Sequence, residues 1–139
     1  MTEAELARIN ASFDAQAMMT TLGATIADIS RGQVVIEAPI LPGSLQQQGF
    51  GHAGLTFSIG DSAAGYAALT TMAPENEVVT AEIKINLLAP ARGDYLRATG
   101  RVIKPGKRLV VVSSEVHAIT GSDAVLIAVL QGTMVPVPR

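Results

Sequence analysis

Residues 51–72 constrain the fold of this chain more than any other segment. The segment lacks proline, is rich in alanine and glycine, and carries one formal charge, at Asp61. A stripe of five residues recurs along it at helical spacing: Leu55, Ile59, Ser62, Tyr66 and Leu69. This pattern predicts one long, mostly buried helix over residues 52–72. With 139 residues, 48% of them hydrophobic, the chain can bury such a helix within a single domain over residues 1–139.

The rest of the chain contains one further helical pattern and several strand patterns. Apolar positions from Glu3 to about Met19 follow helical spacing, which predicts an N-terminal helix within residues 1–20. Residues 21–30 and 33–40 favour two strands of a hairpin that turns at Arg31-Gly32. Four runs rich in β-branched residues follow the central helix, at residues 77–90, 94–104, 108–119 and 124–137. The connections between the last strands are short, so these strands must be antiparallel.

This order of elements favours one architecture. A single long apolar helix before an antiparallel meander is buried best if the sheet curls around the helix. We therefore expect an α+β fold, in which a curved antiparallel sheet wraps around one long central helix, with an additional N-terminal helix. Such a sheet leaves a spare face and open edges, so we expect self-association into a homodimer, and further into a homotetramer built as a dimer of dimers.

Composition excludes several classes of function. The chain has no cysteine, which excludes disulfides and thiolate metal sites and suits a reducing cytoplasm. It shows no signal-peptide pattern and no apolar run of 18 residues, so we expect a cytoplasmic protein that does not bind membranes. Aromatic residues make up 4% and the net charge is -2, which argues against a nucleic-acid partner. His52 and His117 lie far apart without paired carboxylates, so no metal site is expected.

Positive charge is concentrated in one part of the chain. Seven of the ten basic residues lie between Lys84 and Arg108, where Asp94 is the only acid. Two interpretations remain open. The basic side chains are either solvated residues that protect strand edges, or a docking surface for a phosphorylated small molecule.

Residues with chemical potential gather at the start and middle of the predicted central helix. A glycine-rich turn feeds the helix start, where the N–H groups of Ala53 and Gly54 lack helical partners and favour negative charge. Such donors can polarise a carbonyl group. Asp61 is the only acid between Glu37 and Glu75, and a carboxylate within an apolar helix is costly without partners. It is therefore either a structural cap of a backbone group or a catalytic residue.

These residues resemble the motif of the hotdog-fold thioesterases, specifically of the PaaI-like acyl-CoA thioesterases. That family typically shows an Asn or Gln, then His-Gly-Gly at the start of the central helix, then an Asp or Glu about two turns later. Here His52-Ala53-Gly54 and Asp61 occupy the last two positions. Ala53 replaces the first glycine, which keeps the N–H but adds a Cβ where a ligand would approach.

Other parts of the motif lie on either side of the helix. Gln46 or Gln47 stands where the family has its side-chain amide, and Thr80 stands at a position that is often Ser or Thr. The resemblance extends from about Leu22 to the end of the chain. It implies a hotdog fold and an acyl-CoA thioesterase (EC 3.1.2.-) that needs no cofactor, with the CoA thioester as its substrate.

The resemblance also implies roles for the site residues. The N–H of Ala53, with help from Gly54, would polarise the thioester carbonyl, and Asp61 would act as general base on water or as nucleophile. Thr80 would hold the water, and one of the two glutamines would orient the water or the thioester. His52 would either donate a hydrogen bond near the sulfur or brace the loop. Four basic residues are candidates for binding the CoA phosphates: Arg92, Lys104, Lys107 and Arg108.

Helix geometry makes an independent prediction about assembly. Asp61 lies eight residues after Ala53, or roughly 12 Å along a helix that rises about 1.5 Å per residue. It therefore cannot reach a carbonyl bound at the start of its own helix. Two antiparallel helices across a two-fold axis would bring the residues together, so we expect an active site between subunits. Small residues would permit close approach of the two helices: Gly54, Ser58, Gly65 and Ala68.

Two other classes of function remain open. A hotdog hydratase or dehydratase would carry an Asp-x4-His signature, but Tyr66 occupies the histidine position after Asp61. A non-catalytic protein that binds acyl groups or CoA is the stronger alternative, because Ala53 interrupts the motif. We interpret His117, in a strand, as a structural histidine.

Overall fold

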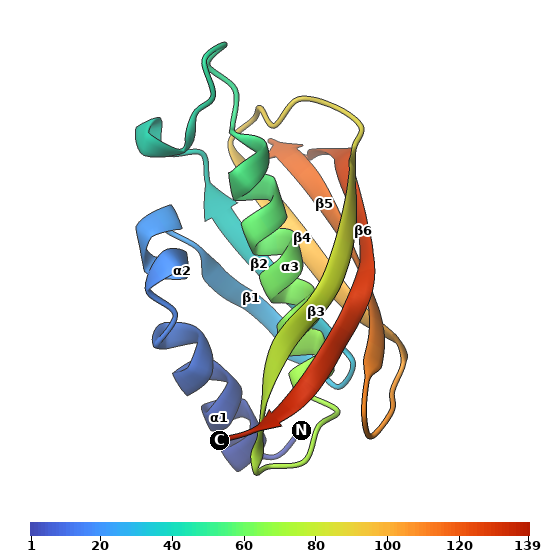
Figure 1. Ribbon diagram of the computed structural model, residues 1–139. Helices are drawn as coiled ribbons and strands as arrows, with labels where there is room; N and C mark the ends of the chain where they lie inside the picture. Colours follow the sequence, from blue (N-terminus) through green and yellow to red (C-terminus); the bar gives the residue numbers. More distant parts are fainter.

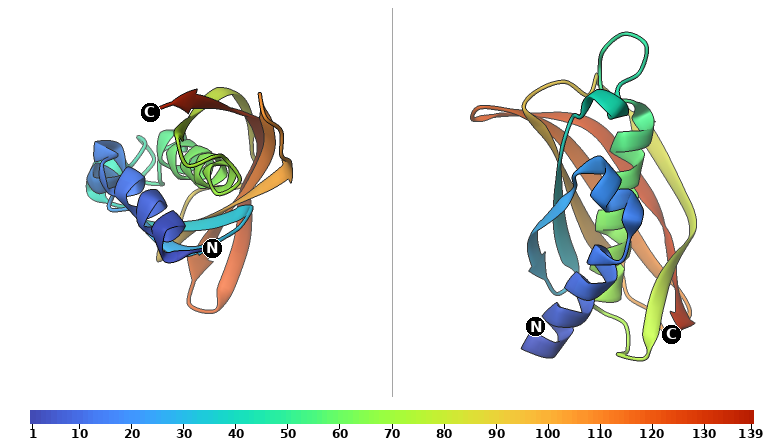
Figure 2. Two further views of the ribbon diagram at one scale, coloured as in Figure 1. Left: turned by 90° about the horizontal axis from the view of Figure 1, so that it is seen from below. Right: turned by 90° about the vertical axis from the view of Figure 1, so that its left-hand side faces the viewer.

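The computed structural model describes residues 1–139 and consists of one curved sheet around a long helix (Figure 1). The helix, α3 (Ala53–Leu69), lies along the concave face of six strands. The strands are β1 (Thr25–Ser30), β2 (Gln33–Pro39), β3 (Asn76–Leu87), β4 (Tyr95–Lys104), β5 (Val110–Thr120) and β6 (Asp123–Pro138). Seen along the helix, the sheet curls around α3 as a sleeve (Figure 2). The predicted hotdog fold is confirmed.

The burial of α3 explains its unusual sequence. Twelve of its 17 residues are buried, including the whole stripe of Leu55, Ile59, Ser62, Tyr66 and Leu69. The glycines of the packed surfaces allow a very close approach. A Cβ on Gly100 of β4 would overlap the α3 backbone at Ala63 and Ala64. Helix and sheet therefore meet almost backbone to backbone, which a helix of larger side chains would prevent.

The central helix is shorter than residues 52–72. His52 caps its start, with extended backbone angles (φ -63°, ψ 145°) and a ring nitrogen that accepts a hydrogen bond from the N–H of Gly54. Thr70 caps its end, and Thr71 and Met72 belong to a turn. The apolar character of Met72 extended the prediction beyond the true end, because that side chain still packs against the core from the turn.

The predicted N-terminal helix is present, but it is divided in two. The structure has two helices, α1 (Glu3–Asp14) and α2 (Ala17–Leu22), with a break at Gln16, whose backbone is extended (φ -83°, ψ 93°). Ile9 and Phe13 of the first helix and Met19 and Leu22 of the second are all buried. The break allows both helices to place apolar side chains on the core, which hydrophobic periodicity does not reveal. A short 3-10 helix, η1 (Pro42–Ser44), lies in the loop before α3.

All neighbouring strands are antiparallel, as predicted, but the four late strands do not form one meander. The order across the sheet is β1-β2-β4-β5-β6-β3. β3 pairs with β6 at the far edge, because the edge of β4 that it would need is occupied by β2. The connection from β3 to β4 crosses near the start of α3, where Gly51 pairs with Ala91 (Figure 1). β1 and β3 are the two open edges.

None of the helices has the length and hydropathy that spanning a bilayer requires.

Candidate active site

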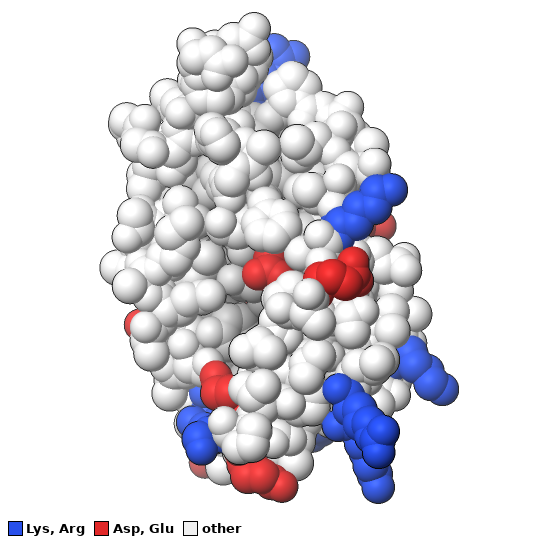
Figure 3. All heavy atoms as spheres, viewed as in Figure 1, with Lys and Arg blue, Asp and Glu red and all other residues white.

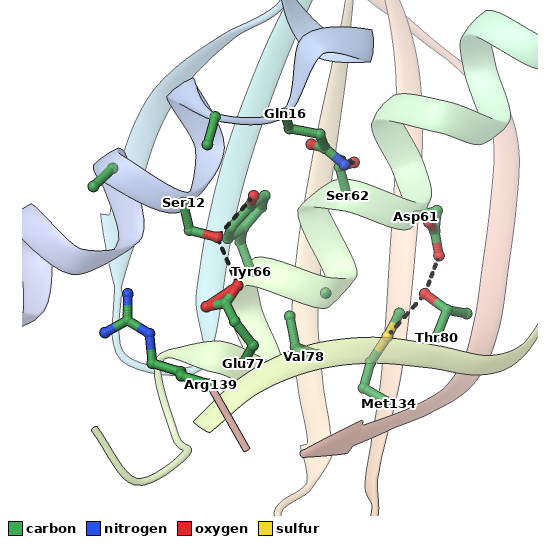
Figure 4. Close-up of a pocket in the computed structure, with 13 residues that line it drawn as sticks. Ser12, Gln16, Asp61, Ser62, Tyr66, Glu77, Val78, Thr80, Met134 and Arg139 are labelled. Atoms are coloured by element: carbon green, nitrogen blue, oxygen red, sulfur yellow. Dashed lines mark hydrogen bonds between the residues drawn. The ribbon is translucent and has the colours of Figure 1, made fainter. Parts of the chain in front are cut away.

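Asp61 lies near the middle of α3, half-buried beside the open edge strand β3. The hydroxyl of Thr80 on β3 donates a 2.8 Å hydrogen bond to Asp61 Oδ1 (Figure 4). No backbone N–H reaches the carboxylate, so Asp61 is not a cap of a backbone group. Burial raises the pKa of Asp61 above its ordinary value, and the hydrogen bond from Thr80 partly offsets that rise. A partly desolvated carboxylate with one oxygen unpaired is suited to accept a proton.

A cavity of about 490 Å³ opens beside Asp61, between the N-terminal helices, α3 and the ends of β3 and β6. Figure 4 shows Asp61 and Thr80 on one side of it and a group of polar side chains on the other. That group consists of Ser12, Tyr66 and Glu77. Between the two sides lie Gln16 and Ser62, which face each other at 3.4 Å. Sequence reasoning did not identify this polar group, because its members come from three separate elements.

The start of α3 forms a second, separate site. The Ala53 N–H has no acceptor within the protein, as predicted. The prediction for Gly54 was wrong, because its N–H donates a 2.7 Å hydrogen bond to His52 Nδ1. Since that nitrogen accepts, the proton of the neutral ring lies on Nε2, which is then a donor. A cavity of about 330 Å³ adjoins Ala53 and His52 and is bounded by the loops that precede α3 and β4.

The structure distinguishes the two candidate glutamines. Gln46 is half-buried, and its Oε1 accepts hydrogen bonds from the N–H groups of Gln48 and Phe50. Gln46 and Gln48 both line the cavity at the start of α3, whereas Gln47 is exposed and does not. Gln46 is therefore the amide placed at this site. Gln48 lines the same cavity; the sequence did not single it out, because only the spacing to His52 distinguishes three adjacent glutamines.

Within one chain the two sites remain apart. Ala53 and Asp61 lie on one continuous helix, roughly 12 Å apart along its axis, and they line different cavities. Thr80 accompanies Asp61, whereas His52 and Gln46 accompany Ala53. The single chain thus presents two halves of the predicted site, and nothing within the chain joins them.

Half of the predicted close-approach surface on α3 is wrong. Gly54 and Ser58 are at least partly accessible, and the Ser58 hydroxyl bonds back to the Gly54 carbonyl. Gly65 and Ala68 are instead buried, with Ala68 in a core cluster that includes Met134. These small residues serve contact with the chain's own sheet. Five residues of α3 are accessible: Ala53, Gly54, Phe57, Ser58 and Asp61, of which Phe57 packs partly against the core.

The four predicted phosphate-binding residues do not form one cluster. Arg92 precedes β4, near the start of α3, and its guanidinium lies 5.9 Å from the Phe50 ring centroid. Three others lie at the opposite end of β4, in the turn to β5, all exposed: Lys104, Lys107 and Arg108. We name these three the hairpin cluster. In Figure 3, Lys and Arg side chains lie mainly along the margins of the visible face, whereas acidic atoms lie both near its middle and towards its lower edge.

Two other basic residues between Lys84 and Arg108 form side-chain contacts within the sheet. Arg97 forms a 2.9 Å ion pair with Glu37, and Arg101 donates to Gln33, both across the β2–β4 ladder. Neither residue forms a phosphate-docking group with the others, and neither protects an open edge, because β4 lies inside the sheet between β2 and β5. His117 lies opposite Arg97 on β5 and is partly buried, which agrees with a structural role.

The fold and the two half-sites define a protein of the hotdog class. A family model described as the thioesterase superfamily matches residues 48–125, more than half of the chain, which include the α3 start, Asp61 and Thr80. The chain belongs to the thioesterase superfamily.

Solved structures agree with this assignment. A thioesterase family protein from Silicibacter pomeroyi is 35% identical, with a TM-score of 0.94 over 97% of this chain and 99% of that one. The E. coli PaaI protein from the phenylacetic acid degradation operon is 24% identical, with a TM-score of 0.85 over 96% of this chain and 93% of that one. The second likeness shows that the fold is shared.

Curated relatives match over shorter segments. A provisionally named esterase of Saccharolobus solfataricus is 42% identical over 72 residues, 52% of this chain and 46% of that protein. The chain thus spans about half the length of that relative. The 1,4-dihydroxy-2-naphthoyl-CoA hydrolase of Listeria monocytogenes is 27% identical over 90 residues, 65% of this chain and 73% of that protein.

Proposed function

We propose that this protein hydrolyses acyl-CoA thioesters to a free acid and CoA, in a site formed between two subunits. One observation carries the proposal. In a member of the thioesterase superfamily, Asp61 is half-buried at a cavity and is held by Thr80, with one carboxylate oxygen free of protein partners. The CoA hydrolase from Listeria among its relatives supports the same class of substrate.

A two-fold dimer supplies what one chain lacks. The accessible face of α3 carries the small residues Ala53, Gly54 and Ser58 together with Asp61. Its one large side chain, Phe57, packs partly against the core, so the small residues remain available for contact with a second helix. Two such faces can pack antiparallel around a two-fold axis that crosses α3 midway between Ala53 and Asp61. This packing brings Asp61 of one subunit towards Ala53 of the other. Each dimer then has two identical sites. Further pairing of dimers through the outer sheet face gives the expected homotetramer.

In this site the thioester carbonyl oxygen accepts a hydrogen bond from the Ala53 N–H. The donor stands at the positive end of the α3 dipole, so it stabilises the negative charge that develops on oxygen during attack. Gly54 serves this purpose indirectly, because its N–H holds the His52 ring. The Nε2–H of His52 is then available as a donor near the sulfur. Gln46, at the same cavity, orients the thioester.

Asp61 of the partner subunit acts as general base. It takes a proton from a water molecule, which adds to the carbonyl carbon, while Thr80 fixes the carboxylate and the water. The tetrahedral intermediate then collapses, the carbon–sulfur bond breaks, and the CoA thiolate leaves. A thiolate is a good leaving group, so no strong general acid is required. Direct attack by Asp61 to give a mixed anhydride is the second possibility.

The CoA phosphates require cations at the mouth of the site. Arg92 stands next to the start of α3, and the hairpin cluster supplies a second group of positive charges beyond the far end of the helix. In an antiparallel dimer, Arg92 of one subunit and the hairpin cluster of the other lie towards the same end of the helix pair. A CoA molecule bound between the subunits can therefore place its phosphates on Arg92 or on the hairpin cluster. The thioester itself requires no metal and no cofactor.

A thiol-release assay distinguishes the proposal from two alternatives. A non-catalytic CoA-binding protein would bind acyl-CoA without releasing thiol. A hydratase is disfavoured because Tyr66, at the position of its histidine, bonds to Ser12 rather than Asp61. We expect free thiol to be released from a panel of acyl-CoA esters and release to be abolished in Asp61→Asn, with CoA affinity retained. Wild-type turnover in the folded Asp61→Asn protein would contradict the proposal.

A further inference from the structure

The polar group across the cavity from Asp61 has no role in the proposed hydrolysis. Ser12 of α1, Tyr66 of α3 and Glu77 of β3 meet there, from positions 54 and 65 residues apart in sequence (Figure 4). Maintaining such a group within a cavity costs free energy unless its hydrogen bonds are satisfied. The group is therefore a candidate for recognition of something within the cavity.

The hydrogen-bond order within this group follows from its chemistry. A carboxylate only accepts, so the Ser12 hydroxyl donates its single proton to Glu77 Oε2, at 2.9 Å. The Tyr66 oxygen lies 3.3 Å from Ser12 Oγ, and since the Ser12 proton is already used, Tyr66 is the donor there. The chain of hydrogen bonds therefore runs from Tyr66 through Ser12 to Glu77. It leaves the Tyr66 oxygen with unused lone pairs and no protein donor.

The phenol is held in its neutral form. Burial raises the pKa of Tyr66 above its ordinary value, and the negative charges of Glu77 and Asp14 add to that rise. At neutral pH the group therefore presents an uncharged acceptor, and a ligand that completes it must bring a hydrogen-bond donor.

We propose that the Tyr66–Ser12–Glu77 chain selects acyl groups that carry a hydroxyl, or another uncharged hydrogen-bond donor, at the end remote from the thioester. This inference rests on the proposed function, because it treats the cavity beside Asp61 as the acyl site. Tyr66 lies five residues after Asp61, roughly 7.5 Å farther along the helix axis. A chain of about six carbons or a single substituted ring fits this separation and the 490 Å³ cavity.

The charge of the cavity argues against an acyl group that ends in a carboxylate. Asp61 and Glu77 both line the cavity, and the only cationic residue among its lining is Arg139, which is exposed at the end of the chain. A second carboxylate beside Glu77 would be repelled, whereas a hydroxyl meets a free acceptor.

The test compares acyl-CoA esters that differ by one atom at the remote end. The pairs are 6-hydroxyhexanoyl-CoA with heptanoyl-CoA, and 4-(hydroxymethyl)benzoyl-CoA with 4-ethylbenzoyl-CoA. We expect kcat/KM to be about tenfold higher for the hydroxyl member of at least one pair, and lowest for adipoyl-CoA, which ends in a carboxylate. Tyr66→Phe keeps the ring that packs edge-on against Phe13 at 5.8 Å and should reduce the ratio to about one.

The chain offers a matched control. Tyr95 is the other tyrosine of the sequence, and its hydroxyl bonds to Arg97 away from this cavity. Tyr95→Phe should keep the preference for the hydroxyl members. A ratio near one in the wild type, a preference that survives Tyr66→Phe, or a preference for adipoyl-CoA would each overturn the inference. Hydrolysis of other acyl-CoA esters, without hydrolysis of any member of either pair, would also overturn the inference.

A binding measurement separates this inference from the proposed function. Asp61→Asn protein does not turn over its ligands under the proposal, so calorimetry gives the affinity for each pair directly. If no ester is hydrolysed by the wild type but the hydroxyl members bind about tenfold more tightly, the proposed function fails and the selection stands. If thiol is released but affinity and kcat/KM are equal for the two members of each pair, the proposed selection for a hydroxyl fails and the proposed function stands.

Discussion

Replacing Ala53 by proline should remove the proposed oxyanion donor without disturbing the helix that presents it. Ala53 is the first residue of α3, and proline is favoured at that position because the N–H there has no helical partner. In this protein the Ala53 N–H has no acceptor within the chain, so no intramolecular hydrogen bond is lost. His52 already has the extended backbone that a residue before proline must adopt (φ -63°, ψ 145°).

The magnitudes follow from these contacts. Because nothing in the folded chain depends on this N–H, we expect the free energy of unfolding to change by less than about 1 kcal/mol. Loss of one donor to a developing oxyanion typically lowers kcat by about 10²–10³-fold. The variant should therefore unfold at nearly the wild-type denaturant concentration while thiol release from acyl-CoA falls by that factor.

Ala53→Val is the matched control, because valine is about as bulky as proline but retains the N–H. It should lose much less activity than Ala53→Pro, and any loss should appear mainly in KM. Folded Ala53→Pro protein with wild-type kcat would refute the donor assignment. Equal losses in the valine and proline variants would show that bulk, rather than the missing donor, is responsible.

Three further variants test the base, the packing and the docking of CoA. Because the hydrogen bond from Thr80 lowers the pKa of Asp61, Thr80→Val should raise that pKa and move the acidic limb of the pH–kcat/KM profile to higher pH, whereas Thr80→Ser should leave the limb in place. An unmoved limb in Thr80→Val would exclude Asp61 as the titrating base. Gly100→Ala should destabilise the fold by about 3 kcal/mol or more in urea denaturation, because its Cβ overlaps the α3 backbone. Gly43→Ala, which meets nothing within 4 Å, should change stability by less than about 0.5 kcal/mol, and equal effects of the two would contradict the packing. Lys107→Glu should raise KM for acyl-CoA roughly fivefold but spare pantetheine thioesters, which lack the nucleotide phosphates; a rise for both would remove the hairpin cluster from CoA binding.

Much of the fold could be predicted from the sequence because its strongest signals are local. The apolar stripe of α3 and the β-branched runs after it specify one buried helix and a late antiparallel sheet, and both are present. The break at Gln16 and the placement of β3 beside β6 could not be predicted. Both depend on which core surface is free to be covered, and neither carries a glycine or proline signal at the decisive position.

The candidate site shows the same division. The family motif assigned Asp61 and Thr80 to the site separately, and the structure places them in hydrogen-bond contact. The capping of Gly54 by His52 depends on a single side-chain rotamer, which spacing does not specify. Ser12 and Glu77 were missed because their contacts with the cavity exist only after α1 has packed beside α3 and β3.

The association of two half-sites from different subunits is tested most directly by mixing two inactive variants. Asp61→Asn and Ala53→Pro protein are produced together with different affinity tags, and dimers that carry both tags are isolated. One of the two sites in each hybrid combines an intact Asp61 with an intact Ala53, so activity should return to about half that of the wild type. Hybrid dimers that remain as inactive as their parents would show that each chain builds its own site and would contradict the account.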